Sequence, residues 1–170
     1  WRRSPQIFAQ PQPVRDIGIR GDESAFLSAA IQNGLDFVVV GGAAVAFHEC
    51  REPDDVDDLD ILVRPEPSNI EKLNQALRSM NTGQSVDLDE ASRPSKHLSI
   101  RRNCKVDILT PHEDEVYDEI KDSSIFSVVF SNNIHVVSKP HLISMKRRAI
   151  EEFGSLEAKH KEDLLCLEAV

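Results

Sequence analysis

The chain has 170 residues, which is enough for one globular domain with its own hydrophobic core. Its formal net charge is −9 at pH 7, and the sequence does not show the extended basic region that DNA or RNA binding normally requires. A nucleic-acid partner is therefore not expected. No apolar run approaches the roughly 20 residues of a membrane-spanning helix, so no membrane association is expected either. The acidic balance favours a small-molecule or cationic acceptor, or a protein partner.

The cysteines are scattered along the chain and form no CxxC pair; they are Cys50, Cys104 and Cys166. An odd number of unclustered cysteines is typical of free thiols in a reducing compartment and speaks against a thiolate metal site. Residues 1–5 are not followed by the apolar segment of a secretory signal. We therefore predict a cytoplasmic protein whose cysteines are free.

The predicted domain organisation has three parts. Residues 1–20 are rich in Pro, Gln and Arg with few periodic apolar positions and are predicted to form an arm, followed by a core over 21–138 and packed helices over 139–170. The predicted elements are helix 23–33, strand 37–40, helix 43–49, strand 57–63, helix 68–80, strands 97–101 and 104–110, helix 112–121, strands 125–130 and 134–137, and helices 140–153 and 155–169. This order predicts an α+β fold, a small mixed β-sheet flanked by helices with a helical C-terminal end.

Some boundaries rest on local signals. Ser68 with Glu71 is typical of a capping box at a helix N-terminus. The polar, weakly patterned residues 84–95 predict a loop, and the turn residues 102–103 predict an antiparallel hairpin between the two strands around them.

Acidic residues on apolar strands are the main chemical signal. Asp58 and Asp60 are two residues apart in a strand, so their side chains point to the same face. Two like charges there are costly unless a cation lies between them, and a divalent metal with oxygen ligands, Mg²⁺ above all, is the simplest candidate. Asp107 is a single acid among Val, Ile and Leu, and on a neighbouring strand it would complete a site for two such ions.

Each acid also has a plainer interpretation. Asp58 and Asp60 could mark a solvated strand end, although the apolar residues that follow place the strand in a core. Asp107 could be a structural acid paired with Arg101 or Lys105. Both alternatives stay open at the level of sequence.

A Gly-Gly pair follows the first predicted strand. Gly41 and Gly42 allow close approach of the backbone, and the N-terminus of the next helix offers free N–H groups to phosphate oxygens. A simple strand-to-helix turn is the alternative. Together with three carboxylates, the pair indicates a site for a triphosphate.

Basic residues near the C-terminus are less specific. Lys146 borders the apolar stripe of its helix, and a side chain that extends its ammonium group into solvent is slightly favoured over a phosphate contact. Lys159 and Asp163 are spaced for an ordinary i,i+4 ion pair.

The run from Val39 to His48, then Arg51, then Asp58 to Val63, resembles the DNA polymerase β-like nucleotidyltransferase superfamily, most of all its minimal bacterial members. The resemblance implies two Mg²⁺ ions and transfer of a nucleoside monophosphate from a nucleoside triphosphate to an acceptor hydroxyl, with ATP as the favoured donor. It implies these roles: Asp58, Asp60 and Asp107 as catalytic metal ligands, and Gly41, Gly42, Arg51 and Lys146 as nucleotide-binding residues.

The resemblance leaves the acceptor open. Aminoglycoside- or lincosamide-type small molecules and a protein side chain are all compatible with it. The alternative is a non-catalytic or regulatory protein of the same fold, such as the antitoxin component of a toxin–antitoxin pair, with an operon-encoded protein as its partner.

Overall fold

The structure is a computed structural model that describes residues 15–129, 131–153 and 158–169. Its helices are α1 (Gly21–Gln32), α2 (Gly41–Phe47), the short 3₁₀ helix η1 (Pro53–Asp55), α3 (Pro67–Ser79), α4 (Leu88–Ala91), α5 (Tyr117–Asp122), α6 (Lys139–Phe153) and α7 (Ala158–Ala169). Its strands are β1 (Phe37–Val40), β2 (Leu59–Val63), β3 (His97–Ile100), β4 (Val106–Leu109), β5 (Ile125–Val129) and β6 (Asn132–Val136). The predicted α+β class is confirmed.

The six strands form one mixed sheet in the order β3-β4-β2-β1-β6-β5. The two central pairings of β2 differ in direction, because β2 runs antiparallel to β1 and parallel to β4. Both predicted hairpins are present, as β3 pairs with β4 and β5 with β6 in antiparallel fashion. The sheet therefore brings β2 and β4 side by side although about forty residues separate them in the chain.

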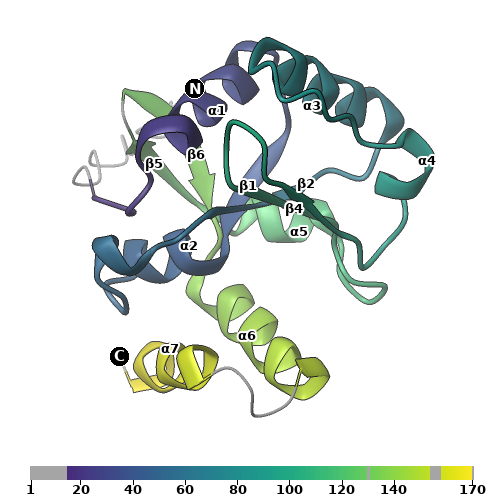
Figure 1. The fold of residues 1–170 in the computed structure, drawn as a ribbon. Coiled ribbons are helices and arrows are strands. Elements are labelled where there is room, and N and C mark those ends of the chain that lie inside the picture. Colours follow the sequence, from purple (N-terminus) through teal and green to yellow (C-terminus); the bar gives the residue numbers. More distant parts are fainter. Residues whose placement is uncertain (1–14, 130, 154–157, 170) are drawn as a thin grey trace, which may run out of the picture.

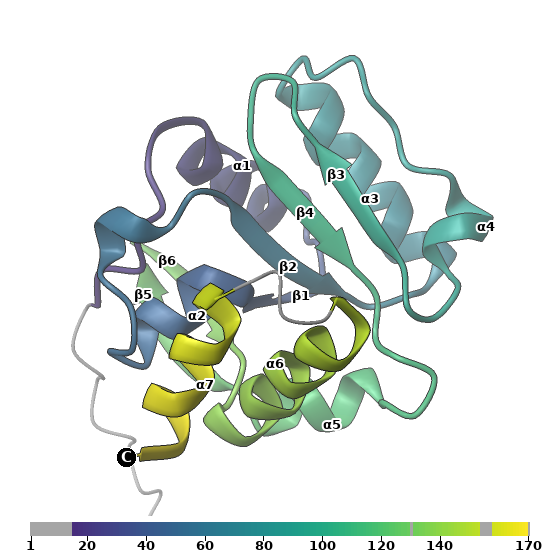
Figure 2. The ribbon, with the colours of Figure 1, turned by 60° about the horizontal axis from the view of Figure 1, so that its bottom comes forward.

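Helices cover both faces of the sheet. Figures 1 and 2 show α1 and α3 together on one face, and α6 and α7 on the opposite side near α2. Every residue of β1 is buried, as its unbroken run of β-branched and aromatic residues predicts for a central strand. The face of the sheet beneath α6 carries the acidic residues of β2 and β4.

The division of the chain into an arm, a core and C-terminal helices stays a prediction, but two of the last residues assigned to the arm are buried. Ile17 is 0% exposed and Ile19 is 1% exposed, so these two side chains belong to the hydrophobic core, whereas Asp16 and Arg20 on either side of them are exposed. Residues 1–14 lie outside the described residues. The segment lacks helical or strand periodicity, which is why apolar periodicity alone missed its burial.

Several predicted boundaries also differ. Helix α3 begins at Pro67 after Glu66 as N-cap, so Ser68 is not a capping residue. Residues 88–91, within a predicted loop, form the single turn α4, which the Asp87 side chain caps. Helix α5 is shorter than predicted. The last residue of the predicted strand 125–130 and the first residues, 155–157, of the predicted last helix lie outside the described part of the chain.

The prediction that all cysteines are free is wrong. Cys50 and Cys166 form a disulfide bond, whereas Cys104 is a free, buried thiol. The bonded residues are 116 positions apart, and only the docking of α7 beside the end of α2 brings them together. The cytoplasmic location was inferred partly from free thiols and stays a prediction.

Among the described residues, no helix combines the length and apolar character needed to cross a membrane.

Candidate active site

Three carboxylates converge on one face of the sheet. Asp60 on β2 is directly opposite Asp107 on β4 in the parallel pairing, and Asp58 lies just before β2 begins. Adjacent strands lie about 4.8 Å apart, so the two registered side chains are close neighbours. The predicted convergence of these three acids is therefore present in the structure, while their roles stay predictions.

The Gly-Gly pair lies against this acidic cluster. Gly41 has a φ of 61°, and a Cβ atom there would overlap the Asp60 carboxylate. Gly41 is therefore required both for its left-handed backbone and for its lack of a side chain. Gly42 is also packed closely, since a Cβ there would lie 2.5 Å from Nη1 of Arg51.

Asp60 is the carboxylate most perturbed by its surroundings. Removal of its carboxyl group from solvent, with the nearby charges of Asp58 and Asp107, raises its pKa to about 7. A hydrogen bond from the backbone N–H of Gly42 opposes that shift. The N–H group that we expected to face phosphate therefore bonds to Asp60 here.

The other two acids are shifted in opposite directions. The pKa of Asp58 is raised, first by burial and then by the charge of Asp107. Burial also disfavours ionisation of Asp107, but interactions with His97, Ser99 and Arg101 outweigh it and lower its pKa to about 2. At neutral pH the cluster thus holds Asp107 fully charged and Asp60 partly protonated.

Two basic side chains from β3 and its turn close over Asp107. Nη2 of Arg101 lies 2.7 Å from Oδ1 of Asp107 and 3.7 Å from Oδ2 of Asp58. His97 places Nε2 3.2 Å from the other oxygen of Asp107, and that carboxylate raises the pKa of the imidazole. The alternative pairing of Asp107 with Arg101 is therefore correct, and it coexists with the three-carboxylate cluster.

A buried ionic cluster lies near the acids, and its cations Arg51 and Lys146 line the same cavity. Asp163 on α7 binds Arg51 through both carboxylate oxygens, with Nη2 of Arg51 2.6 Å from Oδ2, and it also lies 2.8 Å from Nζ of Lys146. Lys146 and Asp163 are 5% and 4% exposed. The preferred interpretation of Lys146 as a lysine reaching solvent is wrong, because its ammonium group is buried with Asp163 and His160.

The predicted pairing of Lys159 with Asp163 is also wrong. Lys159 instead contacts the exposed Asp57, with 2.9 Å between Nζ and Oδ2. One buried carboxylate with two buried cations leaves a local excess of one positive charge. The part of the cavity lined by these cations, its basic end, is therefore suited to an anion, and the part lined by the three acids, its acidic end, to a cation.

A cavity of about 730 Å³ joins the two charged ends. The acidic residues, the Gly-Gly pair, Arg51 and residues of α6 and α7 all line it. Its volume is within the usual range for sites of nucleotide-sized ligands.

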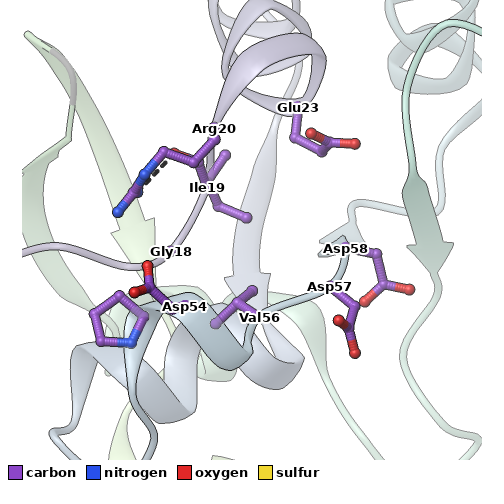
Figure 3. A pocket seen from close by; sticks show the side chains of 9 residues that line it. Gly18, Ile19, Arg20, Glu23, Asp54, Val56, Asp57 and Asp58 are labelled. Atoms are coloured by element: carbon purple, nitrogen blue, oxygen red, sulfur yellow. Dashed lines mark hydrogen bonds between the residues drawn. The ribbon is translucent and has the colours of Figure 1, made fainter.

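A smaller hollow of about 170 Å³ lies behind the acids, between the segment 18–20 and the loop 53–58. Figure 3 shows Asp57 and Asp58 on one side of it and Arg20 on the other. A Cβ on Gly18 would lie 2.7 Å from the side chain of Val56, so the N-terminal segment packs tightly against the loop that precedes β2. That packing supports the backbone that carries Asp58.

The carboxylates fit Mg²⁺ by their chemistry, since they are hard oxygen donors that line one cavity and are costly as a like-charged group. Oδ1 of Asp107 is buried and accepts no hydrogen bond within the described residues, although Arg101 is its ion-pair partner. Within the same residues, no group of three His, Cys, Asp or Glu side chains is already arranged as a metal site. The guanidinium of Arg101 provides the positive charge between Asp58 and Asp107 in this structure.

Comparisons with known proteins agree with this geometry. The solution structure of the antibiotic-resistance factor ANT(2'')-Ia matches with a TM-score of 0.61 at 15% identity, covering 86% of this chain and 80% of that one. The crystal structure of ANT(2")-Ia in complex with adenylyl-2"-tobramycin matches with a TM-score of 0.58 at 18% identity, covering 86% and 85%. The chain has the nucleotidyltransferase fold.

A third structure with this nucleotidyltransferase fold is an antigenic nucleotidyltransferase-like protein from Paracoccidioides brasiliensis, with a TM-score of 0.52 at 14% identity over 92% of this chain and 78% of that one. No protein-family model and no curated protein sequence matches the chain. The resemblance deduced from the sequence motifs is thus confirmed at the level of fold.

Sequence reasoning missed part of the site. His97 and Asp163 were not recognised as neighbours of the candidate site, and Arg101 was considered only as a structural partner. The alternation of β3, with His97 and Ser99 on the same face, was an available signal for His97. Asp163 had no comparable signal, because its partners come from α6 and from the loop after α2.

Proposed function

We propose that the chain is a Mg²⁺-dependent nucleotidyltransferase that moves AMP from ATP to a hydroxyl group of a small molecule or protein. The observation that carries the proposal is the register of Asp60 opposite Asp107, with Asp58 and the Gly-Gly pair beside them, in a cavity with one acidic and one basic end. This arrangement supports binding of an ion by the acids and of a triphosphate between the two ends.

Asp58, Asp60 and Asp107 would hold Mg²⁺, which when bound polarises phosphate oxygens and lowers the pKa of the acceptor hydroxyl. Arg51 and Lys146, held by Asp163, would neutralise phosphate charge at the basic end. The acceptor oxygen forms a bond to the α-phosphorus, the bond from that phosphorus to the bridging oxygen breaks, and pyrophosphate leaves. Asp107, charged at neutral pH, accepts the hydroxyl proton.

Calorimetry with ATP and Mg²⁺ tests the nucleotide site. The Asp58→Ala/Asp60→Ala variant should lose Mg²⁺-dependent ATP binding yet stay folded, because a like-charge repulsion is removed. Asp54→Ala/Asp55→Ala is the matched control, since both acids belong to the preceding short helix η1, outside the large cavity. Equal loss in both double variants, or no ATP binding by the unaltered protein, would overturn the proposal.

Label transfer tests the chemistry. The protein is incubated with ATP labelled in its α-phosphate, with candidate acceptors and with the product of a neighbouring gene. Labelled acceptor together with released pyrophosphate supports transfer, whereas hydrolysis alone contradicts it.

The second candidate is a regulatory protein that keeps the fold without turnover, as in a toxin–antitoxin pair. The specific observation in its favour is Arg101, whose guanidinium occupies the position between Asp58 and Asp107 that a bound cation would need. If Arg101 is only a displaceable counter-ion, Arg101→Ala should strengthen Mn²⁺ binding several-fold, while the exposed neighbour Arg102→Ala should not. Unmeasurable Mn²⁺ binding in all three proteins would favour the regulatory candidate.

A further inference from the structure

An apolar row continues the acidic row along the same face of the sheet. Two residues beyond the Asp60–Asp107 pair, Leu62 on β2 lies opposite Leu109 on β4. His97 on β3 is in turn opposite Leu109. Residues two apart on a strand share a face and lie about 7 Å from one another, so the apolar row begins within one side-chain length of Asp107.

A second cavity of about 230 Å³ lies over this apolar row. It shares with the large cavity the residues Val40, His97, Leu109, Met145 and Ala149. Met145 and Ala149 are four residues apart on α6, so the same side of that helix covers both cavities. A molecule in the second cavity would therefore have a short path to the carboxylate of Asp107.

The charged side chains of the second cavity balance one another. Two are basic, Lys96 and Arg148, and two are acidic, Glu115 and Glu152. Glu115 is already engaged through both oxygens, by Nη1 of Arg148 at 2.9 Å and by the backbone N–H of His112 at 2.9 Å. Only Glu152, an exposed residue, presents a carboxylate that no described neighbour pairs with.

This lining does not suit a ligand with several positive charges. Each ammonium group that leaves water needs a carboxylate or a set of hydrogen-bond acceptors in return, and the apolar row provides neither. It does suit the apolar side of a ring or short chain whose hydroxyl groups point toward Asp107.

We propose that the second cavity is the acceptor subsite, and that its ligand is an uncharged or singly charged alcohol with an apolar face. The inference rests on the proposed nucleotidyl transfer and narrows its substrate class. The acceptor hydroxyl enters from this cavity, its oxygen bonds to the α-phosphorus, pyrophosphate departs and the proton goes to Asp107. The solved ANT(2")-Ia complex holds adenylyl-2"-tobramycin, so the two proteins would share a fold and differ in acceptor charge.

The first experiment uses the full chain with Mg²⁺ and a non-hydrolysable ATP analogue. Three probes are compared by calorimetry: octyl glucoside below its micellar concentration as a neutral amphipathic alcohol, lincomycin as a singly charged one, and tobramycin as a polyamine. We expect the better of the first two to bind at least about tenfold more tightly than tobramycin. Tobramycin binding as tightly or more tightly, or no binding of either amphipathic alcohol, would overturn the inference.

The second experiment changes the charge of the cavity. Lys96→Glu should raise tobramycin affinity about fivefold or more relative to octyl glucoside affinity, because the cavity then carries unpaired acids. Lys72→Glu is the matched control with the same change in net charge, since Lys72 is exposed on α3 at the opposite face of the sheet. Equal gains in both variants would mean that overall charge, not this cavity, attracts the polyamine.

Binding of the ATP analogue itself separates the two levels of inference. Absence of Mg²⁺-dependent analogue binding tells against the proposed function. Normal analogue binding with a preference for tobramycin overturns only the acceptor subsite.

Discussion

At the scale of single residues, the site is dominated by charged groups whose burial costs free energy. Burial and the neighbouring acids raise the pKa of Asp60 to about 7, whereas His97 and Arg101 keep Asp107 ionised. The two acids face each other across neighbouring strands but differ in protonation at neutral pH. A cation that entered the cluster would relieve Asp60 most, because its charged form is the least favoured of the three.

The raised pKa of Asp60 predicts how stability depends on pH. From about pH 4 to pH 7 the folded state retains a proton that the unfolded state has lost, so this group makes stability fall as pH rises. Asp60→Asn removes that cost, and its gain over the unaltered protein should be small at pH 4.5 and reach at most about 4 kcal/mol at pH 8. Urea denaturation of both proteins at the two pH values measures it. A gain that is the same at both values would contradict the assigned cause.

Gly41 allows the closest backbone approach to Asp60. Gly41→Ala should destabilise the fold by about 1–3 kcal/mol more than Gly34→Ala, because the new Cβ would overlap the Asp60 carboxylate. Gly34 is the matched control, since its φ of 68° carries the same left-handed penalty but open space surrounds its Cα. Thermal melting measures the loss of stability in the two variants. Equal losses would show that only backbone strain matters at Gly41.

At the scale of elements, the register of β2 against β4 builds the acidic end, and helices α6 and α7 build the basic end. Helix α7 buries only Asp163 and Leu167 among its described residues, so a carboxylate is a main part of its attachment. Each of these charged residues belongs to a single helix, strand or loop, whereas each ion pair connects two of these elements. The cavity therefore depends on how α7 is held.

Asp163 is expected to be structurally important because it is buried between two cations. Asp163→Ala should cost about 3–5 kcal/mol, since Arg51 and Lys146 would stay buried without this carboxylate to balance their charge. Asp57→Ala is a suitable control, because Asp57 also pairs with a lysine but is exposed, and its loss should have no measurable effect. Chemical denaturation compares the two. Similar small losses would mean that Asp163 is not held as the structure shows.

At the scale of the whole molecule, three long-range features join the two ends of the chain. Ile17 and Ile19 pack into the core, β6 pairs with β1 at the centre of the sheet, and the Cys50–Cys166 disulfide attaches α7 to the loop after α2. The shape of the cavity therefore depends on contacts made along nearly the full described length of the chain.

The disulfide should stabilise the whole molecule. It closes a loop between residues 116 apart, so reduction should lower the free energy of unfolding by about 2–5 kcal/mol. Thermal melting with and without dithiothreitol measures the effect. The Cys166→Ser variant is the control, because its melting temperature should not respond to the reductant. If the unaltered protein does not respond either, its thiols are free, as the sequence alone suggested.

The sequence by itself determined most of the elements and the acids that share a face. Alternation placed Asp58 and Asp60 together, the apolar setting of Asp107 marked a second strand, and the Gly-Gly pair marked the turn into α2. These signals are local, because strand and helix periodicity and glycine geometry act over a few residues.

Only the tertiary structure decided which distant groups meet. The pairing of Asp60 with Asp107, the burial of Lys146 with Asp163, the bond between Cys50 and Cys166 and the core position of Ile17 all join segments far apart in the chain. The balance between sheet register, helix docking and burial of charge sets these contacts, and no short pattern encodes that balance. The acceptor cavity has the same origin, since Leu109 and Ala149 become neighbours only when α6 packs over the sheet.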